Sequence, residues 1–297
     1  MKKLIACAAA LILCLYSAVT VYGLSDGNKY HQPPAAVEVE QFPLEALAKG
    51  ADVEEVGVYL NDNSFLKPKD TVIADGNHWS YSDGSCSINI DKIWYGESNV
   101  FVAHLTFSDY SRFRTVLSGG TAATVSSDYG ALLVVNNDVA TGTGYVTIRD
   151  GNVVIDGNLS TVATYSRNDG RLRGGDYNGQ SASDLAASGA VTDTFQFGPE
   201  FLVNGSVIAW DAGGRAQRTF IGTNGNAGDI VIGVSSGRYV DGVSQGLAYR
   251  ECAEILQNYG CTFGAPLDGG GSSTMIFRGT VLVGSQRGGL QDFILFK

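Results

Sequence analysis

The sequence predicts an α+β protein, a mixed and β-dominated single domain with a few helices behind an apolar N-terminal segment. The 39 glycines against 6 prolines indicate many tight turns between short elements. Short apolar runs separated by turn residues recur from about residue 87 to the C-terminus. Hydrophobic residues make up 44% and charged residues 17% of the chain, a composition that supports a substantial core.

Two tight hairpins are the clearest local predictions. Runs at 145–149 and 153–155 flank Asp150-Gly151-Asn152, and runs at 201–203 and 207–210 flank Asn204-Gly205-Ser206. The pattern predicts further strands at 100–107, 131–135, 218–221, 230–234, 274–278 and 292–296. Apolar residues at helical spacing predict one substantial helix over 246–259, ending near Gly260.

The N-terminus has the features of an export signal. Lys2 and Lys3 precede an apolar stretch from Leu4 to Val21, which places the start of the chain on the cytoplasmic side. The length of this stretch fits both an uncleaved signal anchor and a cleaved signal peptide. We therefore expect the rest of the chain to be extracytoplasmic, either secreted or attached to the membrane through this segment.

Three regions follow from this reading. Residues 1–24 form the signal peptide or anchor, 25–86 a stalk and irregular segment with one short helix near 43–49, and 87–297 the folded domain.

Composition argues against several functions. The formal net charge of -10 is the wrong sign for a nucleic-acid-binding surface. Three histidines and no CxxC motif make a zinc site improbable, so no metal site is predicted. A cofactor is not required, although Asp268 and nearby carbonyls have the chemistry to bind calcium. Cys252 and Cys261 fit a disulfide pair and a pair of buried thiols equally well.

One segment carries the functional hypothesis: Pro266-Leu267-Asp268-Gly269-Gly270-Gly271-Ser272-Ser273-Thr274-Met275. Three consecutive glycines cost backbone entropy, which suggests that main-chain N–H groups approach a ligand closely and form an anion-binding nest. Asp268 would face the same ligand. A glycine-rich structural turn capped by Asp268 is the alternative.

This segment, preceded by Gly260-Cys261, resembles the signature of the phosphodiester glycosidase family, which includes bacterial members linked to exopolysaccharide. Further resemblances lie at 193–205, which contains Phe197-Gly198-Pro199, at 217–222 around Arg218, at 231–238 ending in Arg238, and at 130–136 ending in Asn136. A further resemblance near the C-terminus covers Arg287, Gly288 and Asp292. Pro266, Ser236, Gln217 and Asn137 depart from the family pattern, in which an aspartate is usual at position 236.

The resemblance implies an enzyme that cleaves a sugar-1-phosphate diester. Asp268 would be the carboxylate, as nucleophile or as base for water, and Arg218 and Arg238 would clamp the phosphate. The main-chain amides of Gly269, Gly270, Gly271 and Ser272 would assist. The sugar or phosphate would be held by Ser272, Ser273, Asn136 and Arg287.

Each of these residues also has a structural interpretation, as a surface ion pair, a loop cap or a turn residue. The expected partner is a sugar-phosphodiester substrate or a wall or capsule polymer. A non-catalytic sugar-phosphate-binding module and a structural envelope protein are the alternatives, because a fold alone does not specify a function.

Overall fold

The computed structural model describes residues 71–74, 76–138, 145–157, 161–176, 180–208 and 214–297. The expected signal segment, the short helix near 43–49 and most of the expected stalk lie outside these residues. All statements below refer to the described part of the chain.

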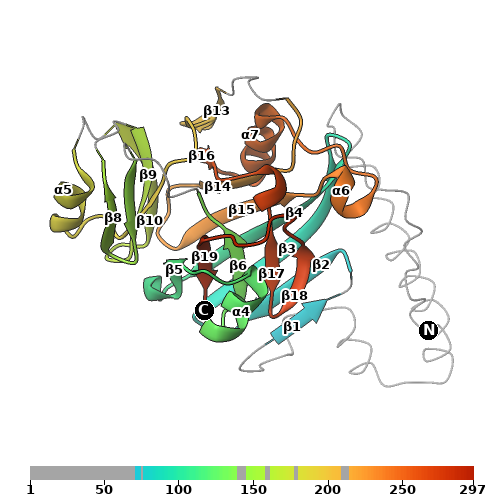
Figure 1. Ribbon diagram of the computed structural model, residues 1–297, viewed down its shortest axis with the longest axis horizontal. Coiled ribbons are helices and arrows are strands. Elements are labelled where there is room, and N and C mark those ends of the chain that lie inside the picture. The colour runs from blue at the N-terminus through green and yellow to red at the C-terminus, as the bar shows by residue number, and fades with distance from the viewer. Residues whose placement is uncertain (1–70, 75, 139–144, 158–160, 177–179, 209–213) are drawn as a thin grey trace, which may run out of the picture.

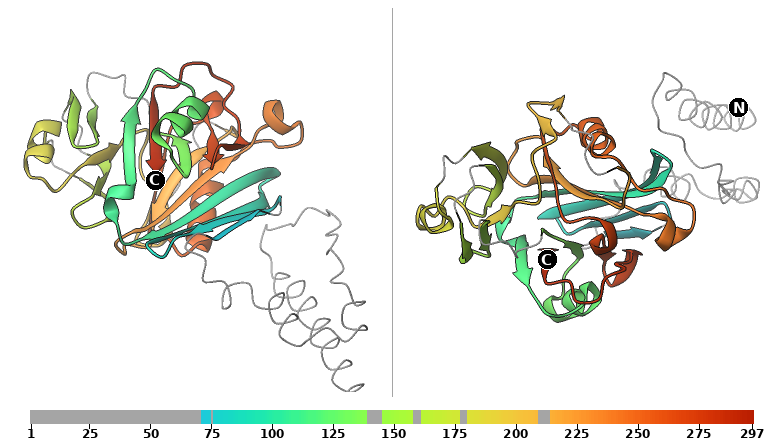
Figure 2. Two further views of the ribbon diagram at one scale, coloured as in Figure 1. Left: turned by 90° about the horizontal axis from the view of Figure 1, so that it is seen from below. Right: turned by 45° about the horizontal axis from the view of Figure 1, so that its top comes forward.

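Two antiparallel sheets form the centre of the fold (Figures 1 and 2). The nine-stranded sheet has the spatial order β1 (Thr71–Ala74), β2 (His78–Ser82), β3 (Cys86–Tyr95), β4 (Ser98–Phe107), β15 (Asp229–Ser235), β14 (Thr219–Thr223), β16 (Phe263–Pro266), β12 (Leu202–Val203) and β13 (Ser206–Val207). The five-stranded sheet has the order β18 (Thr280–Val283), β17 (Met275–Phe277), β6 (Leu133–Asn136), β19 (Asp292–Phe296) and β5 (Phe113–Leu117).

The main hydrophobic core fills the space between these two sheets. Leu133 and Val135 of β6 point into it, while Val134 points to the opposite face of the same sheet. In the nine-stranded sheet, Ile232 of β15 faces the same core and Val231 the other side. Because successive side chains of a strand alternate between faces, both sheets are buried on both sides.

Helices cover the outer faces. Helix α7 (Tyr249–Asn258) packs on the nine-stranded sheet through a cluster that contains Ile255, Leu256 and Phe220, and α4 (Ala122–Tyr129) packs on the five-stranded sheet through Val125. The other helices are short: η1 (Tyr110–Arg112), α5 (Ala182–Ala187), α6 (Arg238–Asp241) and η2 (Gly270–Ser272).

A smaller unit closes one end of the molecule. It contains β10 (Arg171–Asp176), β9 (Thr161–Ser166) and β11 (Asp193–Phe195), together with the hairpin of β7 (Val146–Arg149) and β8 (Asn152–Asp156). Figure 1 shows this unit and α5 at the end opposite to α6. Tyr165 and Phe195 extend the main core into it, so it belongs to the same folded body.

The β-dominated α+β class and the predicted strands within the described residues are confirmed. Both predicted hairpin turns have two consecutive residues with positive φ, at Asp150-Gly151 and Asn204-Gly205, which is the geometry of type I′ turns. The predicted helix begins three residues late, because Gly246 has a left-handed φ and Glu251 accepts a hydrogen bond from the amide of Ala248 at the helix start.

Three features differ from expectation. The sheet begins at Thr71 rather than near Ser87, because β1 and β2 extend it at its edge. Helices α4 and α5 were not predicted, although Thr121 and Ser181 cap their N-termini through side-chain hydrogen bonds. Cys252 and Cys261 are buried free thiols rather than a disulfide.

No helix among the described residues combines the length and the apolar content needed to cross a membrane.

Candidate functional site

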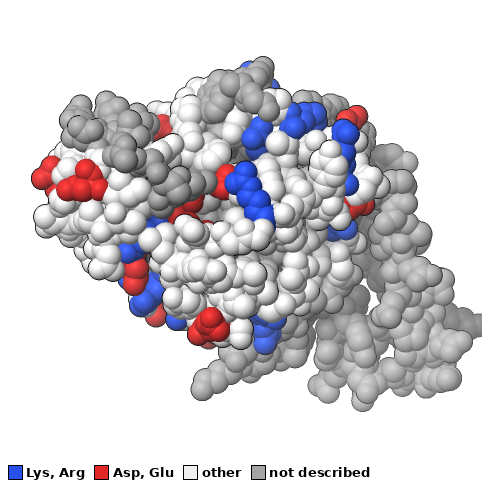
Figure 3. Space-filling view, viewed as in Figure 1, with Lys and Arg blue, Asp and Glu red and all other residues white. Residues whose placement is uncertain are grey.

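A pocket of about 550 Å³ opens at the end of the five-stranded sheet. Its walls come from the end of β5, the segment after β6, the loop before η2 and the loop before β19. The lining residues include Asn136, Asn137, Asp138, Asp268, Ser272, Arg287, Gln291 and Asp292. On the face drawn in Figure 3, acidic side chains are recessed near the centre with a basic side chain beside them. Three of the lining residues are aspartates, so the pocket is predominantly acidic.

Asp268 lies where the chain leaves β16 and enters η2. The amide of Leu267 donates to Thr219 O (2.8 Å) and that of Asp268 to Asn137 O (3.2 Å), which anchors this turn to both sheets. The side chain is 12% exposed. Burial raises the pKa of the Asp268 carboxyl, as does Asp138, whereas hydrogen bonds from Ser272 and Gly269 and the charge of Arg287 oppose the shift.

Arg287 and Ser272 stand beside Asp268. Arg287 Nη1 donates to Ser272 Oγ (3.0 Å) and lies 3.7 Å from Asp268 Oδ2. Its side chain is 61% exposed, so the guanidinium has faces open to a ligand. The main-chain oxygen of Gly271 accepts hydrogen bonds from Ser285 Oγ and from the amides of Gln286 and Arg287, which fixes the loop that carries Arg287.

The glycines of the segment are required mainly by backbone geometry. A Cβ on Gly269 would lie 2.8 Å from Gln217 O, and Gly270 has a left-handed φ of 59°. The amides of Gly270, Ser272 and Ser273 donate to the main-chain oxygens of Gln217, Gly269 and Gly270 respectively. Of the amides expected to form the nest, those of Gly270 and Ser272 are therefore not free, because they are already paired within the protein.

Asn136 positions the site and does not have the free groups expected of a substrate ligand. Its Nδ2 donates to Asp268 O (2.6 Å), and its Oδ1 accepts from Thr219 Oγ1 and from the amide of Thr274, both at 2.9 Å. The weaker contact of Nδ2 to Asn137 O (3.3 Å) uses its second hydrogen. Ser273 is likewise fully buried, and its Oγ lies 3.2 Å from Thr219 Oγ1. Both side chains stabilise the Asp268 turn from behind.

Arg218 and Arg238 do not line the pocket at Asp268. The guanidinium of Arg218 donates to Leu247 O (3.2 Å) and Gly214 O (2.8 Å) and stacks on the ring of Tyr249 at 4.0 Å. Arg238, exposed at the start of α6, donates to Gln245 Oε1 (2.9 Å). The expected clamp of Asp268, Arg218 and Arg238 is therefore not assembled in this pocket, and Arg287 is the arginine that faces Asp268.

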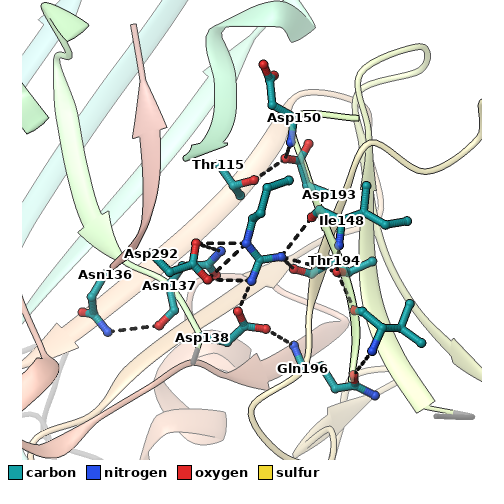
Figure 4. Close-up of polar contacts among 12 residues, drawn as sticks. Thr115, Asn136, Asn137, Asp138, Ile148, Asp150, Asp193, Thr194, Gln196 and Asp292 are labelled. Atoms are coloured by element: carbon teal, nitrogen blue, oxygen red, sulfur yellow. Dashed lines mark hydrogen bonds and ion pairs between the residues drawn. The ribbon is translucent and has the colours of Figure 1, made fainter. Parts of the chain in front are cut away.

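Behind the pocket lies a buried charge network that the sequence interpretation missed. Arg149, only 3% exposed, donates through Nε and Nη2 to Asp292 (2.6–3.1 Å) and through Nη2 to Asp138. Its Nη1 donates to Ile148 O (2.9 Å) and Thr194 O (2.7 Å). Figure 4 shows Asp138, Asp292 and Thr194 arranged around this guanidinium.

Asp138 and Asp292 join this network to the pocket, because both line it and both contact Arg149. Asp138 Oδ2 also accepts from the amide of Gln196 (2.5 Å). Burial and the nearby Asp138 raise the pKa of Asp292 to about 8, against the opposing attraction of Arg149. The available signal for Arg149 was a charged residue at the end of the predicted strand 145–149. Asp292 lies in a segment already noted for its family resemblance.

The fold and the acidic pocket beside a glycine-rich turn define a β-dominated protein with a polar site at the end of its five-stranded sheet. The sequence model described as phosphodiester glycosidase matches residues 124–291, more than half of the chain. The chain belongs to the phosphodiester glycosidase family.

One solved structure supports the same fold. The catalytic domain of zebrafish N-acetylglucosamine-1-phosphodiester α-N-acetylglucosaminidase, described as auto-inhibited by its pro-peptide, is 14% identical with a TM-score of 0.55, covering 80% of this chain and 92% of that chain. A hypothetical protein from Synechocystis is 15% identical with a TM-score of 0.48, covering 77% and 63% of the two chains. No curated protein matches the chain.

We expect Arg149→Met to lower the free energy of unfolding by about 3–5 kcal/mol, because it leaves the buried carboxyl groups of Asp138 and Asp292 without the guanidinium that binds them. Urea denaturation monitored by circular dichroism measures this loss. The matched control is Arg114→Met, which removes a half-exposed arginine 3.6 Å from Asp150 and should cost about 1 kcal/mol or less. Equal losses in the two variants would contradict the structural role of Arg149.

The raised pKa of Asp292 predicts a pH dependence of stability. An aspartate in the unfolded chain titrates near pH 3.9, so between about pH 4 and 8 the folded state retains a proton that the unfolded state has lost. Stability therefore falls as pH rises through this window, by at most about 1.4 kcal/mol per pH unit from this group. Urea denaturation at pH 5, 6, 7 and 8 should give a shallower slope for Asp292→Asn than for the wild type; identical slopes would refute the assignment.

Proposed function

We propose that this protein is an exported phosphodiester glycosidase that hydrolyses a sugar-1-phosphate diester in the pocket at Asp268. The observation that carries the proposal is the placement of a buried carboxylate, a serine hydroxyl and an open guanidinium in one pocket, at Asp268, Ser272 and Arg287. Membership of the phosphodiester glycosidase family supports the reaction class.

The chemistry follows from the residues present. The bond between the anomeric carbon and the phosphate oxygen breaks, and the electron pair leaves with the phosphate monoester. Asp268, in its ionised form, acts either as nucleophile at the anomeric carbon, giving a glycosyl ester that water then hydrolyses, or as base for a water that attacks this carbon directly. The products are the free sugar and a phosphate monoester.

Stabilising the leaving phosphate is the task assigned to Arg287. A guanidinium binds phosphate oxygens in a bidentate geometry, and this one is open to solvent on the pocket rim. Ser272 connects Arg287 to Asp268, so one hydroxyl orients both groups. No cofactor is required in this scheme, and no group of three metal-ligating side chains suited to an ion occurs among the described residues.

The substrate class is inferred from the relative and the N-terminus. The zebrafish enzyme acts, by its name, on an N-acetylglucosamine phosphodiester, so an N-acetylhexosamine linked to a wall polymer or exopolysaccharide is the proposed substrate. The N-terminal signal supports an extracytoplasmic location, secreted or membrane-attached.

A non-catalytic sugar-phosphate-binding module is the alternative, motivated by Ser236 in place of the family's usual aspartate. Ser236 is buried, its amide donates to Asn99 O (2.8 Å), and it does not line the pocket. The substitution therefore leaves the groups around Asp268 in place, which favours the catalytic proposal.

The test is hydrolysis of a panel of α-N-acetylglucosaminyl phosphodiesters by the full chain. We expect Asp268→Asn to lower kcat/KM by about 10²–10⁴-fold and Arg287→Ala by about 10- to 100-fold, the range for loss of a charge-assisted hydrogen bond. The control is Arg171→Ala, an exposed arginine on β10, which should retain wild-type turnover.

Two outcomes would contradict the proposal. Wild-type turnover by Asp268→Asn would remove the carboxylate from the mechanism. Loss of activity in Arg238→Ala with full activity in Arg287→Ala would move the phosphate site from the pocket rim to the region of α6.

A further inference from the structure

A second pocket, of about 320 Å³, lies along β5, the edge strand of the five-stranded sheet. Its other walls come from the end of α4, the end of β19 and the β7–β8 hairpin. Leu117 lines both this pocket and the pocket at Asp268, so the two are continuous at the end of β5. We call the second pocket the β5 groove, and the lining residues that matter here are Arg114, Leu117, Tyr129, Arg149, Val154 and Lys297.

Arg149 separates the groove from the pocket. It lines the β5 groove, whereas its partners Asp138 and Asp292 line the Asp268 pocket. Its five N–H groups are all directed to these two aspartates and to the main-chain oxygens of Ile148 and Thr194. Arg149 therefore gives the groove a fixed wall and no donor for a ligand.

Two other cationic side chains line the groove as close neighbours. Leu295 is the cross-strand partner of Arg114, and Lys297 follows two residues later, where its amide continues the ladder by donating to Arg112 O (3.1 Å). Side chains two residues apart share a face, so Arg114 and Lys297 are diagonal neighbours with Cβ atoms about 7–8 Å apart. Like charges at this spacing repel, and an anion bound between them would offset the repulsion.

The guanidinium of Arg114 has donors left for a ligand. Its Nε donates to Ser111 O (3.0 Å), and its Nη1 lies 3.6 Å from Asp150 Oδ2, which is too long for a hydrogen bond. Asp150 also forms an ion pair with Arg167, which does not line the groove. The negative charge of Asp150 is therefore compensated from outside, and Arg114 is half-exposed beside it.

Lys297 and the apolar walls complete the groove. Lys297 Nζ lies 5.2 Å from the ring centroid of Tyr129, while Arg112 Nε donates to the main-chain oxygen of Lys297 and holds its backbone. Leu117, Tyr129 and Val154 are 39–41% exposed along the groove. Apolar walls with a few placed charged groups are usual in a ligand-binding site.

We propose that the β5 groove is a second anion subsite, in which Arg114 and Lys297 bind a further phosphate of a polymeric substrate whose reacting unit occupies the Asp268 pocket. Arg114 lies three residues along β5 from Leu117, about 10 Å, so the group that it binds lies beyond the reacting unit. This inference rests on the proposed function for the reacting unit. It deepens that function by naming the substrate class as a polymer with repeated phosphodiesters.

The experiment measures the binding of labelled oligomers of N-acetylglucosamine 1-phosphate to the full chain by fluorescence anisotropy. The probes have one, two or three phosphodiester repeats, and chitotriose with the same label is the neutral probe. Asp268→Asn is the background in which binding is measured, so that no probe is hydrolysed. We expect the three-repeat probe to bind about tenfold more tightly than the one-repeat probe, the gain from one charge-assisted hydrogen bond.

The double variant Arg114→Gln/Lys297→Gln should lower the affinity for the three-repeat probe about tenfold, to that of the one-repeat probe. Arg114→Lys, which keeps the charge, should retain part of the gain. Arg287→Ala should weaken both probes by the same factor. The matched control is Arg250→Gln, which removes an exposed arginine on α7 and should match the unsubstituted protein for every probe.

Equal affinities for one and three repeats, or a gain with length that survives the double substitution in a folded protein, would overturn the proposal. So would binding of inorganic phosphate that depends on Arg114 without any gain with length, because the groove would then be a site for the free ion. Cleavage of the one-repeat probe by the wild type without a gain with length leaves the glycosidase proposal standing and removes the polymer subsite. Binding that increases with length but without cleavage of any probe has the opposite meaning.

Discussion

The buried guanidinium of Arg149 is the constraint on which the site depends. A charge that is 3% exposed must be compensated inside the protein, and Asp138, Asp292 and two main-chain oxygens do so. These partners lie in four segments of the chain: the segment after β6, the start of β19, β7 itself and β11. The hydrogen bonds of the Arg149 side chain thus hold the ends of β6, β7 and β19 together. The pocket lies on the outer side of these strand ends.

Asn136 holds the turn that carries Asp268 in place by hydrogen bonds, as Arg149 does for the strand ends. Its amide joins the end of β6 to the Asp268 turn, to Thr219 of β14 and to Thr274 before β17. The carboxylate is therefore held by both sheets of the sandwich rather than by a free loop. Such support is what a reactive group requires, because small displacements of a catalytic side chain strongly reduce its effect.

Much of the fold was predictable because its signals are local. Alternating apolar residues, the Asp150-Gly151 and Asn204-Gly205 turns and the apolar stripe of α7 each act over a few residues. The Asp268 segment was also recognisable. Arg149 and Asp292 are 143 positions apart in sequence, so their pairing depends on the strand order and no local pattern reveals it. For the same reason, Arg287 rather than Arg218 or Arg238 proved to be the arginine beside Asp268.

The two ends of the pocket also bear on the charge of Asp268. Burial and the charge of Asp138 raise its pKa, whereas the hydrogen bond from Ser272 and the charge of Arg287 lower it. A phosphodiester bound at Arg287 would place a negative charge there and weaken this opposing effect, so the hydrogen bonds from Ser272 and Gly269 would have to keep Asp268 ionised for the proposed reaction. The proton affinity of Asp268 would thus change with occupancy of the rim, through the same arginine that holds the leaving group.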